Sequence, residues 1–377
     1  MRVLVCPDKF AGSISAPEAA AALAQGWREV HPQHRVHQRP QADGGPGFLD
    51  VVAAAVDGHR VPVQTVDPLG RPVPAWILVA PGPPVTAYVE SAQAVGLHLL
   101  QPAERDPLAA TSYGLGVLLT AAVEAGAVEV VVGLGGSAVN DGGAGMLAAL
   151  GATPLSAAGY ALPYGGAALL DVARLAGSPT LRGVRPVAAT DVDNPLLGRY
   201  GASVVFGPQK GASPAEVEVL EAALARFAEV LERDLPTCPP GLARLPGAGA
   251  AGGLGAALLA LGGRCESGIG LIHRLTGFDA ALADCDLVIT GEGSFDHQSL
   301  RGKVVSGVAA AARARGLPCV VVAGRVSVDQ AEAAEAGITA CHSLVDQFDG
   351  DIDAAMSRAA EGLREIAARL ARQPGVS

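Results

Sequence analysis

The sequence predicts an α/β protein built around a doubly wound parallel sheet, and three observations support this class. Short apolar runs alternate with helical segments near both ends of the chain, which favours parallel strands. Half of the 377 residues are apolar and only 17% are charged, which suits a large core. Gly-rich loops with acidic residues follow several apolar runs, as at the carboxyl ends of parallel strands.

The amino-terminal segment begins with a strand, a turn and a helix. Ser15-Ala16-Pro17-Glu18 is a capping box with proline in the first turn, so a helix should continue to about Val30. The other expected elements are strands at 3–6 and 61–66, a polar loop at 42–45 and an apolar segment at 48–56. This rhythm implies a parallel sheet that includes both strands.

The texture of the sequence changes after Pro68. Runs at 76–79 and 85–90 are broken by Pro and Gly, which suggests antiparallel strands in a different domain. The further elements expected here are strands at 128–134 and 187–190, a helix at 215–233, and a Gly-rich turn that enters a helix within 247–261.

The alternation of strands and helices returns near Gly277. The expected strands are at 286–290, 319–323 and 338–341, with a loop at 291–293. The expected helices are one that ends at 283, one at 302–315 and one at 351–372. The simplest assembly is a flavodoxin-like or Rossmann-like domain made of residues 1–67 and 270–377. Residues 68–269 would form an inserted mixed α/β domain, with the active site in the cleft between the two.

Charge and cysteine content narrow the function classes. The net charge of −10 argues against nucleic acid as a partner. The apolar stretch at 250–263 is too short and Gly-rich to span a membrane, and the chain opens without a signal-peptide pattern. The six scattered cysteines are typical of reduced thiols, so we expect a cytoplasmic protein. Its oligomeric state, a homodimer included, stays open.

Acidic residues recur where the predicted strands end, namely Asp8, Asp43, Asp191, Glu292 and Asp296, with Asn140 and Asp141 shortly after another strand. Each alone fits a turn or a helix cap. In a wound sheet, however, these positions face one crevice. Clustered carboxylates suit Mg²⁺ held together with phosphates, and glycines let backbone N–H groups approach phosphate oxygens.

Four Gly-rich loops accompany these acids, at 43–45, 133–137, 247–253 and 291–293. The third contains G-x-G-x-x-G, the pattern of an NAD-linked dehydrogenase. It lacks a preceding strand, so that alternative is weak. Neither a P-loop nor a protein-kinase motif set occurs.

Lysine is scarce in a chain rich in arginine. There are 24 arginines and three lysines, Lys9, Lys210 and Lys303, each beside a Gly-containing turn. The simplest explanation of the imbalance is a high-GC coding bias. Under that bias, a lysine that remains marks a place where a compact ammonium is needed, so we expect at least two to touch ligand.

The order of these motifs resembles the bacterial glycerate kinase family, of the type that includes glycerate 2-kinases. The matching segments are PDKFAGS at 7–13, ADGG at 42–45, GLGGSAVNDGGAG at 133–145, ATDVDNPL at 189–196, VFGPQKGA at 205–212, the glycines at 247–255, TGEGSFD at 290–296 and QSLRGK at 298–303. The resemblance covers nearly the whole chain, from Arg2 to about Asp346.

The resemblance implies phosphoryl transfer from ATP to D-glycerate with Mg²⁺, giving 2-phosphoglycerate. The alternatives are the 3-phosphoglycerate product, a related small hydroxy acid as substrate, and a non-catalytic ligand-binding relative. Asp191 ends a buried strand and begins a rigid turn, so it is our first choice of general base, with Asp8 and Asp43 as alternatives. Lys9, Arg325 and the turn at Gly12-Ser13 are candidates for the substrate carboxylate.

The full set of predicted site residues follows from these arguments. The catalytic residues are Asp191, Lys9 and Asp8, and the metal ligands are Asp191, Asp296 and Glu292. The residues for substrate and nucleotide are Asp43, Gly44, Gly45, Gly135, Gly136, Ser137, Asn140, Asp141, Asn194, Gln209, Lys210, Gly252, Gly253, Gly291, Glu292, Ser294, Lys303 and Arg325.

Two loops depart from the family pattern. Family members often have Lys where this chain has Ala11, and Glu-Gly-Thr where it has Pro46-Gly47-Phe48. An ammonium, a carboxylate and a hydroxyl are therefore missing, although Lys9 lies close enough in sequence to replace the cation. We expect a variant that retains activity. The alternative is altered substrate choice or lost activity.

Overall fold

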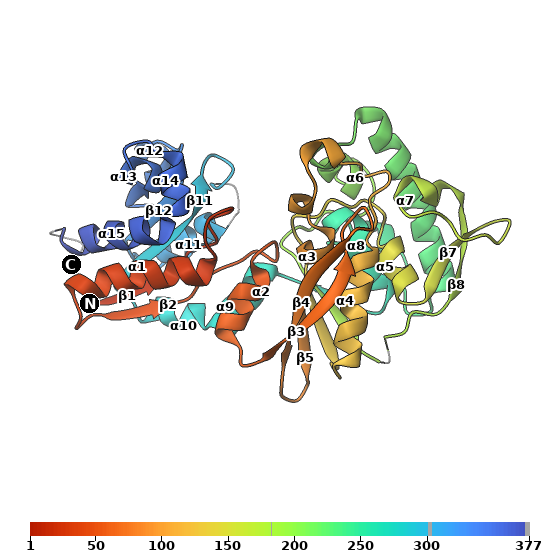
Figure 1. Cartoon of the computed structure of the whole chain (residues 1–377), viewed down its shortest axis with the longest axis horizontal. Coiled ribbons are helices and arrows are strands. Elements are labelled where there is room, and N and C mark those ends of the chain that lie inside the picture. The colour runs from red at the N-terminus through yellow and green to blue at the C-terminus, as the bar shows by residue number, and fades with distance from the viewer. Residues whose placement is uncertain (182, 301–303, 374–377) are drawn as a thin grey trace. The chain divides into compact units, whose positions relative to one another are not determined.

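The structure is a computed structural model, and it describes residues 1–181, 183–300 and 304–373 (Figure 1). The chain divides into two compact units. Unit 1 contains residues 1–43, 50–56 and those from 269 onward, and unit 2 contains residues 44–49 and 57–268. None of the described helices is both long and apolar enough to cross a membrane.

The sheet of unit 1 has five parallel strands in the spatial order β13-β12-β11-β1-β2. Their bounds are Arg2–Val5 (β1), Arg35–Gln38 (β2), Leu287–Phe295 (β11), Cys319–Val326 (β12) and Ala340–Ser343 (β13). Numbered along the chain, the order is 2-1-3-4-5, that of flavodoxin-like sheets. It reverses between β1 and β11, the switch point of the sheet. The predicted fold class is therefore confirmed.

Helices cover both faces of this sheet. One face packs against α1 (Ala16–Val30), α13 (Leu344–Gln347), α14 (Ile352–Ser357) and α15 (Ala359–Ala371), and the other against α10 (Phe278–Ala283), α11 (Val304–Arg313) and α12 (Gln330–Glu335). α1 begins at the predicted capping box, in which the Ser15 hydroxyl accepts from the N–H of Glu18. α1 and α15 lie side by side because Gly26 has no side chain: a Cβ there would lie 1.9 Å from the Arg364 carbonyl oxygen (Figure 1).

Unit 2 contains a mixed six-stranded sheet in the order β10-β9-β6-β5-β4-β3. Its strands are His59–Val66 (β3), Pro72–Ala80 (β4), Thr86–Glu90 (β5), Glu129–Gly133 (β6), Arg185–Ala189 (β9) and Arg264–Glu266 (β10). The strands β10, β9, β6 and β5 are parallel to one another. The pairs β5–β4 and β4–β3 are antiparallel. The predicted antiparallel pairing of β4 with β5 is confirmed.

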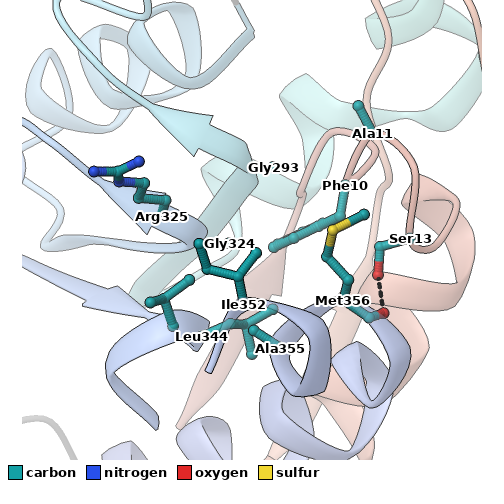
Figure 2. A pocket seen from close by; sticks show the side chains of 11 residues that line it. Phe10, Ala11, Ser13, Gly293, Gly324, Arg325, Leu344, Ile352, Ala355 and Met356 are labelled. Atoms are coloured by element: carbon teal, nitrogen blue, oxygen red, sulfur yellow. Dashed lines mark hydrogen bonds between the residues drawn. The ribbon is translucent and has the colours of Figure 1, made fainter. Parts of the chain in front are cut away.

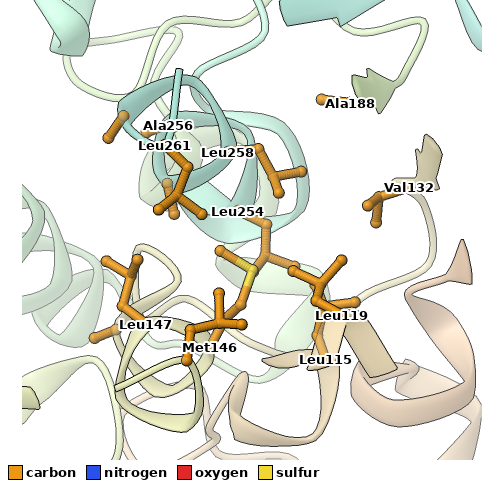
Figure 3. Packing of buried hydrophobic residues seen from close by; sticks show 14 of the residues in the cluster. Leu115, Leu119, Val132, Met146, Leu147, Ala188, Leu254, Ala256, Leu258 and Leu261 are labelled. Atoms are coloured by element: carbon orange, nitrogen blue, oxygen red, sulfur yellow. The ribbon is translucent and has the colours of Figure 1, made fainter. Parts of the chain in front are cut away.

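Helices and short turns complete unit 2. The helices are α3 (Ala92–Val95), α4 (Tyr113–Glu124), α5 (Ala144–Ala149), α6 (Ala202–Phe206), α7 (Pro214–Asp234) and α8 (Ala250–Ala260), and a hairpin joins β7 (Ala152–Ser156) to β8 (Val172–Gly177). The 3₁₀ turns are η1 (Leu97–Leu99), η2 (Pro102–Glu104), η3 (Ala167–Asp171), η4 (Pro208–Lys210) and η5 (Leu242–Arg244). Apolar side chains of α4, α5 and α8 pack together with β6 and β9 in one core (Figure 3). Two helices, α2 (Phe48–Ala55) and α9 (Gly268–Thr276), contain residues of both units.

The strand near residue 290 is longer than predicted. Residues 291–293, expected as a loop, continue β11, where Glu292 pairs with Ala323 and Ser294 with Arg325 of β12. A Cβ on Gly291 would lie 1.8 Å from the Val322 carbonyl oxygen, so the glycine allows close strand pairing rather than a turn.

Two further predictions about elements are wrong, and one strand was missed. β3 was expected in the parallel sheet, but it pairs antiparallel with β4 in unit 2. The polar strand β2 was missed, because only Val36 among its four residues is apolar. The single tail helix is two helices, α14 and α15, that meet at Arg358, whose backbone leaves the helical region.

Candidate active site

Three carboxylates gather at the switch point of unit 1. Asp8 follows β1, Asp43 follows β2, and Glu292 lies near the carboxyl end of β11. The N–H of Asp8 donates to the Gly291 carbonyl oxygen at 2.8 Å, which fixes the loop after β1 against β11. We call Asp8, Asp43 and Glu292 the carboxylate cluster. Lys9 adjoins it, and its backbone N–H donates to Asp8 Oδ1 at 2.7 Å.

The surroundings of Asp8 disfavour its negative charge. The pKa of the half-buried Asp8 carboxyl is raised to about 7, chiefly because burial disfavours the ionised form. The charge of Lys9 opposes this shift, and those of Asp43 and Glu292 add to it. A cation close to Asp8 would favour its ionised form, because an opposite charge nearby lowers the pKa of a carboxyl.

A glycine-rich loop and a buried lysine border a small cavity in unit 2. Gly135, Gly136 and Ser137 follow β6, and Lys210 ends η4. Together with Ala251 they border a cavity of about 130 Å³, which we call the glycine–lysine pocket. Within the described residues, the N–H groups of 135–137 donate no hydrogen bond. Backbone donors beside an ammonium are suited to an anion.

Lys210 is held firmly at this pocket. It is 1% exposed, and its Nζ donates to Ser137 Oγ at 3.1 Å and to the Val139 carbonyl oxygen at 2.6 Å. Burial lowers its pKa to about 7, and the charge of Asp141 opposes that shift. An ammonium has three donors, so one further hydrogen bond remains for a ligand.

The backbone at Ala251 is strained beside this pocket. Ala251, Gly252 and Gly253 are all left-handed, with φ of 51°, 71° and 92°. For alanine this conformation costs roughly 1–2 kcal/mol. Such strain is common at ligand sites, and Ala251 lines the cavity.

Asp191 lies in a wider cavity of unit 2. The cavity of about 390 Å³ is bordered by Asp191, Asp193, Glu266 and Ser267, and Val192 borders both this cavity and the glycine–lysine pocket. Asp191 follows β9, is exposed, and accepts a hydrogen bond from Ser267 Oγ at 2.7 Å through Oδ1. Its carboxylate is thus oriented and open to solvent.

Two predicted site residues hold the loop after β6. The buried Asp141 carboxylate accepts from the N–H and hydroxyl of Ser112 and from the N–H groups of Gly143 and Gly145. Burial raises the pKa of Asp141, and these hydrogen bonds oppose the rise. Asn140 Nδ2 donates to Ser203 Oγ at 3.0 Å. Neither residue borders the described cavities of unit 2.

Gly252 and Gly253 allow close backbone packing. A Cβ on Gly252 would lie 2.0 Å from the Val139 carbonyl oxygen, and one on Gly253 would lie 2.8 Å from Gly142 Cα. The segment follows the 3₁₀ turn η5 rather than a strand. The dinucleotide fingerprint requires a strand there, so the dehydrogenase alternative is wrong.

The second polar loop packs against the strand ends of unit 2. A Cβ on Gly44 would lie 2.8 Å from the Ala189 carbonyl oxygen, and one on Gly135 would lie 2.6 Å from Gly45 Cα. Asn194 stabilises the loop after β9, where its Nδ2 donates to the Tyr200 carbonyl oxygen at 2.8 Å. Gln209 is exposed and lines the glycine–lysine pocket.

The remaining predicted residues belong to unit 1, apart from Lys303, which lies outside the described residues. Asp296 Oδ1 accepts from the N–H groups of Gln298 and Ser299, so it forms the turn after β11. The predicted metal ligands divide between the units, with Asp191 in unit 2 and Glu292 and Asp296 in unit 1. No group of three His, Cys, Asp or Glu side chains in the described part of the chain forms a ready metal site.

Two site residues escaped the sequence reasoning. Ser267 orients Asp191, and Ser112 anchors Asp141, yet both are single hydroxyls outside any motif. Ser267 directly follows β10, and pairing of β10 with β9 was the only signal that could have placed it beside Asp191.

Comparison with known proteins gives consistent matches over almost the whole chain. A family model described as the glycerate kinase family matches residues 3–374. A protein of Escherichia coli K12 named glycerate 2-kinase is 41% identical, with 98% of each chain covered. An uncharacterized protein of Mycobacterium tuberculosis is 45% identical over 100% of this chain and 92% of its own length. A crystal structure from Salmonella typhimurium LT2, under the name glycerate kinase 2, matches with a TM-score of 0.80 at 40% identity, covering 98% of this chain and 97% of its own.

Proposed function

The chain belongs to the glycerate kinase family, and on this premise we propose that it transfers the γ-phosphoryl group of ATP to D-glycerate, giving 2-phosphoglycerate and ADP. The relative named glycerate 2-kinase supports the 2-phosphate as product. The proposed location is the cytoplasm. A 3-phosphoglycerate product and a related hydroxy acid remain the alternatives.

The glycine–lysine pocket is the proposed site of the glycerate carboxylate. Its volume of about 130 Å³ suits a small anion, and its donors are the N–H groups of 135–137 and the ammonium of Lys210. We prefer Lys210 to the earlier candidates Lys9, Arg325 and the Gly12-Ser13 turn, because Lys210 is buried and already borders this pocket. This arrangement is the single observation in the structure that carries the proposal.

Asp191 is the proposed general base. Val192 borders both the cavity of Asp191 and the glycine–lysine pocket. A substrate whose carboxylate is held in the glycine–lysine pocket would therefore have its hydroxyl in the same unit as the Asp191 carboxylate. In the step, the substrate hydroxyl oxygen forms a bond to the γ-phosphorus, the bond to the β–γ bridging oxygen breaks, and the proton passes to Asp191. Ser267 fixes the orientation of the carboxylate through its hydrogen bond.

The carboxylate cluster is the proposed place of a magnesium ion. Asp8, Asp43 and Glu292 offer carboxylate oxygens at one sheet edge, and the charges of Asp43 and Glu292 add to the rise in the pKa of Asp8 that burial mainly causes. When bound, Mg²⁺ would neutralise charge on the nucleotide phosphates. Asp8 and Glu292 are the residues that would hold it, and Lys9 would add a positive charge beside the phosphates. Asp191 and Asp296 remain proposed ligands from the sequence.

Product analysis tests the proposal. The protein, incubated with ATP, Mg²⁺ and D-glycerate, should yield 2-phosphoglycerate in a ³¹P NMR spectrum, and excess EDTA should stop the reaction. A 3-phosphoglycerate signal would select the first alternative. No turnover with either enantiomer of glycerate, together with retained nucleotide binding, would point to a non-catalytic relative and refute the kinase proposal.

A further inference from the structure

An apolar pocket in unit 1 takes no part in the proposed transfer step. It lies where β11 and β12 end and has a volume of about 200 Å³ (Figure 2). The loop after β1, α13 and α14 supply its walls. We call it the apolar pocket and define it by Phe10, Gly293, Gly324, Leu344, Ile352 and Met356.

The walls of this pocket leave apolar surface uncovered. Ile352 and Met356 are 53% and 46% exposed, although both side chains are large and apolar. Figure 2 shows Phe10 and Met356 next to each other at the centre of the pocket. The one hydroxyl in the lining, that of Ser13, already donates to the Met356 carbonyl oxygen at 2.7 Å. A flat apolar ring would bury this surface, and a methionine sulfur packs well against an aromatic ring.

Two of the residues that line the pocket are the glycines Gly293 and Gly324. A Cβ on Gly324 would lie 2.3 Å from the Gly293 carbonyl oxygen, and one on Gly293 would lie 3.0 Å from the Ala11 backbone nitrogen. Two adjacent strands therefore contribute residues without side chains to the lining of the apolar pocket. Peptide N–H and C=O groups are hydrogen-bonding partners for the polar edge of a heterocyclic base.

A positive charge lies at the rim. Arg325 follows Gly324 on β12 and is exposed, and its guanidinium makes no hydrogen bond or ion pair within the described residues. In Figure 2 it extends away from the apolar side chains. Glu292 of the carboxylate cluster immediately precedes Gly293 on the neighbouring strand. Apolar surface, the guanidinium of Arg325 and carboxylates of the cluster thus occur together at one sheet edge.

We propose that the apolar pocket holds the purine base of the nucleotide, with Arg325 turned toward the phosphates. This inference rests on the proposed function, which requires a nucleotide. The position agrees with the rule that doubly wound sheets bind ligands at the carboxyl ends of strands beside the switch point. Complete ligand pockets measure about 300–1,000 Å³, so this pocket suits a ring, with ribose and phosphates outside. Glycerate, small and charged, has no apolar part to fill it.

Photoaffinity labelling tests the location directly. The full chain is irradiated with 8-azido-ATP, digested and mapped by mass spectrometry, with excess ADP as competitor. Label that ADP displaces should fall within residues 8–13, 291–295 or 344–356. Displaceable label confined to residues 57–268 would overturn the inference while leaving kinase activity, and hence the proposed function, intact. Absence of both labelling and turnover would remove the two together.

A pair of double variants tests the chemistry of the walls. Ile352→Gln with Met356→Gln should weaken ADP binding about tenfold in calorimetry and change the affinity for inorganic tripolyphosphate less than about twofold. Ile352→Val with Met356→Leu is the matched control and should bind both like the wild type. Both positions are exposed, and circular dichroism checks that the variants fold. Equal losses for ADP and tripolyphosphate, or unchanged ADP binding, would overturn the inference.

Discussion

The carboxylate cluster of unit 1 and the glycine–lysine pocket of unit 2 lie at equivalent positions of their own sheets, but their side chains carry opposite charges. Each follows the carboxyl ends of parallel strands, β1 and β11 in one sheet, β6 and β9 in the other. In unit 1 the residues after the strands are acidic, and the pKa of Asp8 is raised. In unit 2 they are mainly glycines beside a lysine whose pKa is lowered.

The difference shows how one sheet geometry supports two kinds of ligand. Carboxylates at the strand ends favour a cation and the phosphates that accompany it, whereas free backbone N–H groups and a buried ammonium favour an anion. We therefore assign the nucleotide to unit 1 and glycerate to unit 2 as a proposal, and the following predictions test that division of roles.

The largest effect is expected at the base proposed for unit 2. Asp191→Asn keeps the size of the side chain and its hydrogen bond with Ser267 but cannot accept the substrate proton, so kcat should fall by about two to four powers of ten. The adjacent Asp193→Asn is the control, since Asp193 borders the same cavity, and it should stay within a few-fold of wild type. A kcat of Asp191→Asn within a few-fold of wild type would contradict the assignment and favour Asp8 or Asp43 as the base.

A glycine substitution tests whether Gly252 serves close backbone packing in unit 2. Gly252→Ala adds a Cβ only 2.0 Å from the Val139 carbonyl oxygen at a φ of 71°. We expect the free energy of unfolding to fall by about 2–4 kcal/mol, from the left-handed backbone and the collision together. Gly241→Ala also has positive φ but open space around it, and should cost only about 1–2 kcal/mol. Equal losses in urea denaturation would show that packing at Gly252 is loose.

The buried ammonium of unit 2 gives a pH signature. The pKa of Lys210 is about 7 in the folded chain, against an ordinary 10.5, so the unfolded chain binds more protons between these values. The free energy of unfolding should therefore rise with pH in that window, by up to about 1.4 kcal/mol per pH unit. Lys210→Met removes this contribution. Urea denaturation of wild type and variant between pH 7 and 10 should give diverging profiles, and parallel ones would contradict the assignment.

The acidic cluster of unit 1 should give a smaller effect with the opposite slope. The pKa of Asp8 is raised to about 7, so the folded chain binds more protons than the unfolded chain between about pH 4 and 7. Stability falls as pH rises through that window and stays lower above it. Asp8→Asn should then raise the free energy of unfolding at pH 8 and not at pH 4. The gain at pH 8 should be only about 1 kcal/mol, because water screens the charge of a half-buried group. No gain at pH 8 would show that the folded chain does not raise the pKa of Asp8.

Local signals in the sequence predicted most of the fold. The capping box set the start of α1, and apolar runs located β1, β6, β9, β12 and the helix α7. The errors have a common cause. Gly291 and Gly293 were taken as turn residues, but pairing with β12 keeps them in a strand, and β3 joined the other sheet through pairing with β4. Strand pairing is decided by partners far away in sequence, which local patterns do not contain.

The candidate site was predicted in part. The scarcity of lysine singled out Lys210 and the glycine pattern singled out Gly135 and Gly136, and the fold brings these residues to one pocket. Whether they contact ligand stays a prediction. In the sequence, Asp141 resembled the other predicted site residues. In the structure its carboxylate accepts hydrogen bonds from groups of the fold itself. The apolar pocket left no trace in any motif, because Phe10, Leu344 and Met356 are ordinary apolar residues that only the fold brings together.

Hydrogen exchange with each ligand alone tests the proposed division of roles most directly. Amide exchange is followed by mass spectrometry in the full chain with saturating D-glycerate, with saturating ADP and Mg²⁺, and without ligand. Glycerate alone should slow exchange in residues 133–139 and 205–212 of unit 2. ADP with Mg²⁺ should slow it in residues 8–13, 291–295 and 344–356 of unit 1. Protection by ADP in the glycine–lysine pocket, or by glycerate at the carboxylate cluster, would contradict the account.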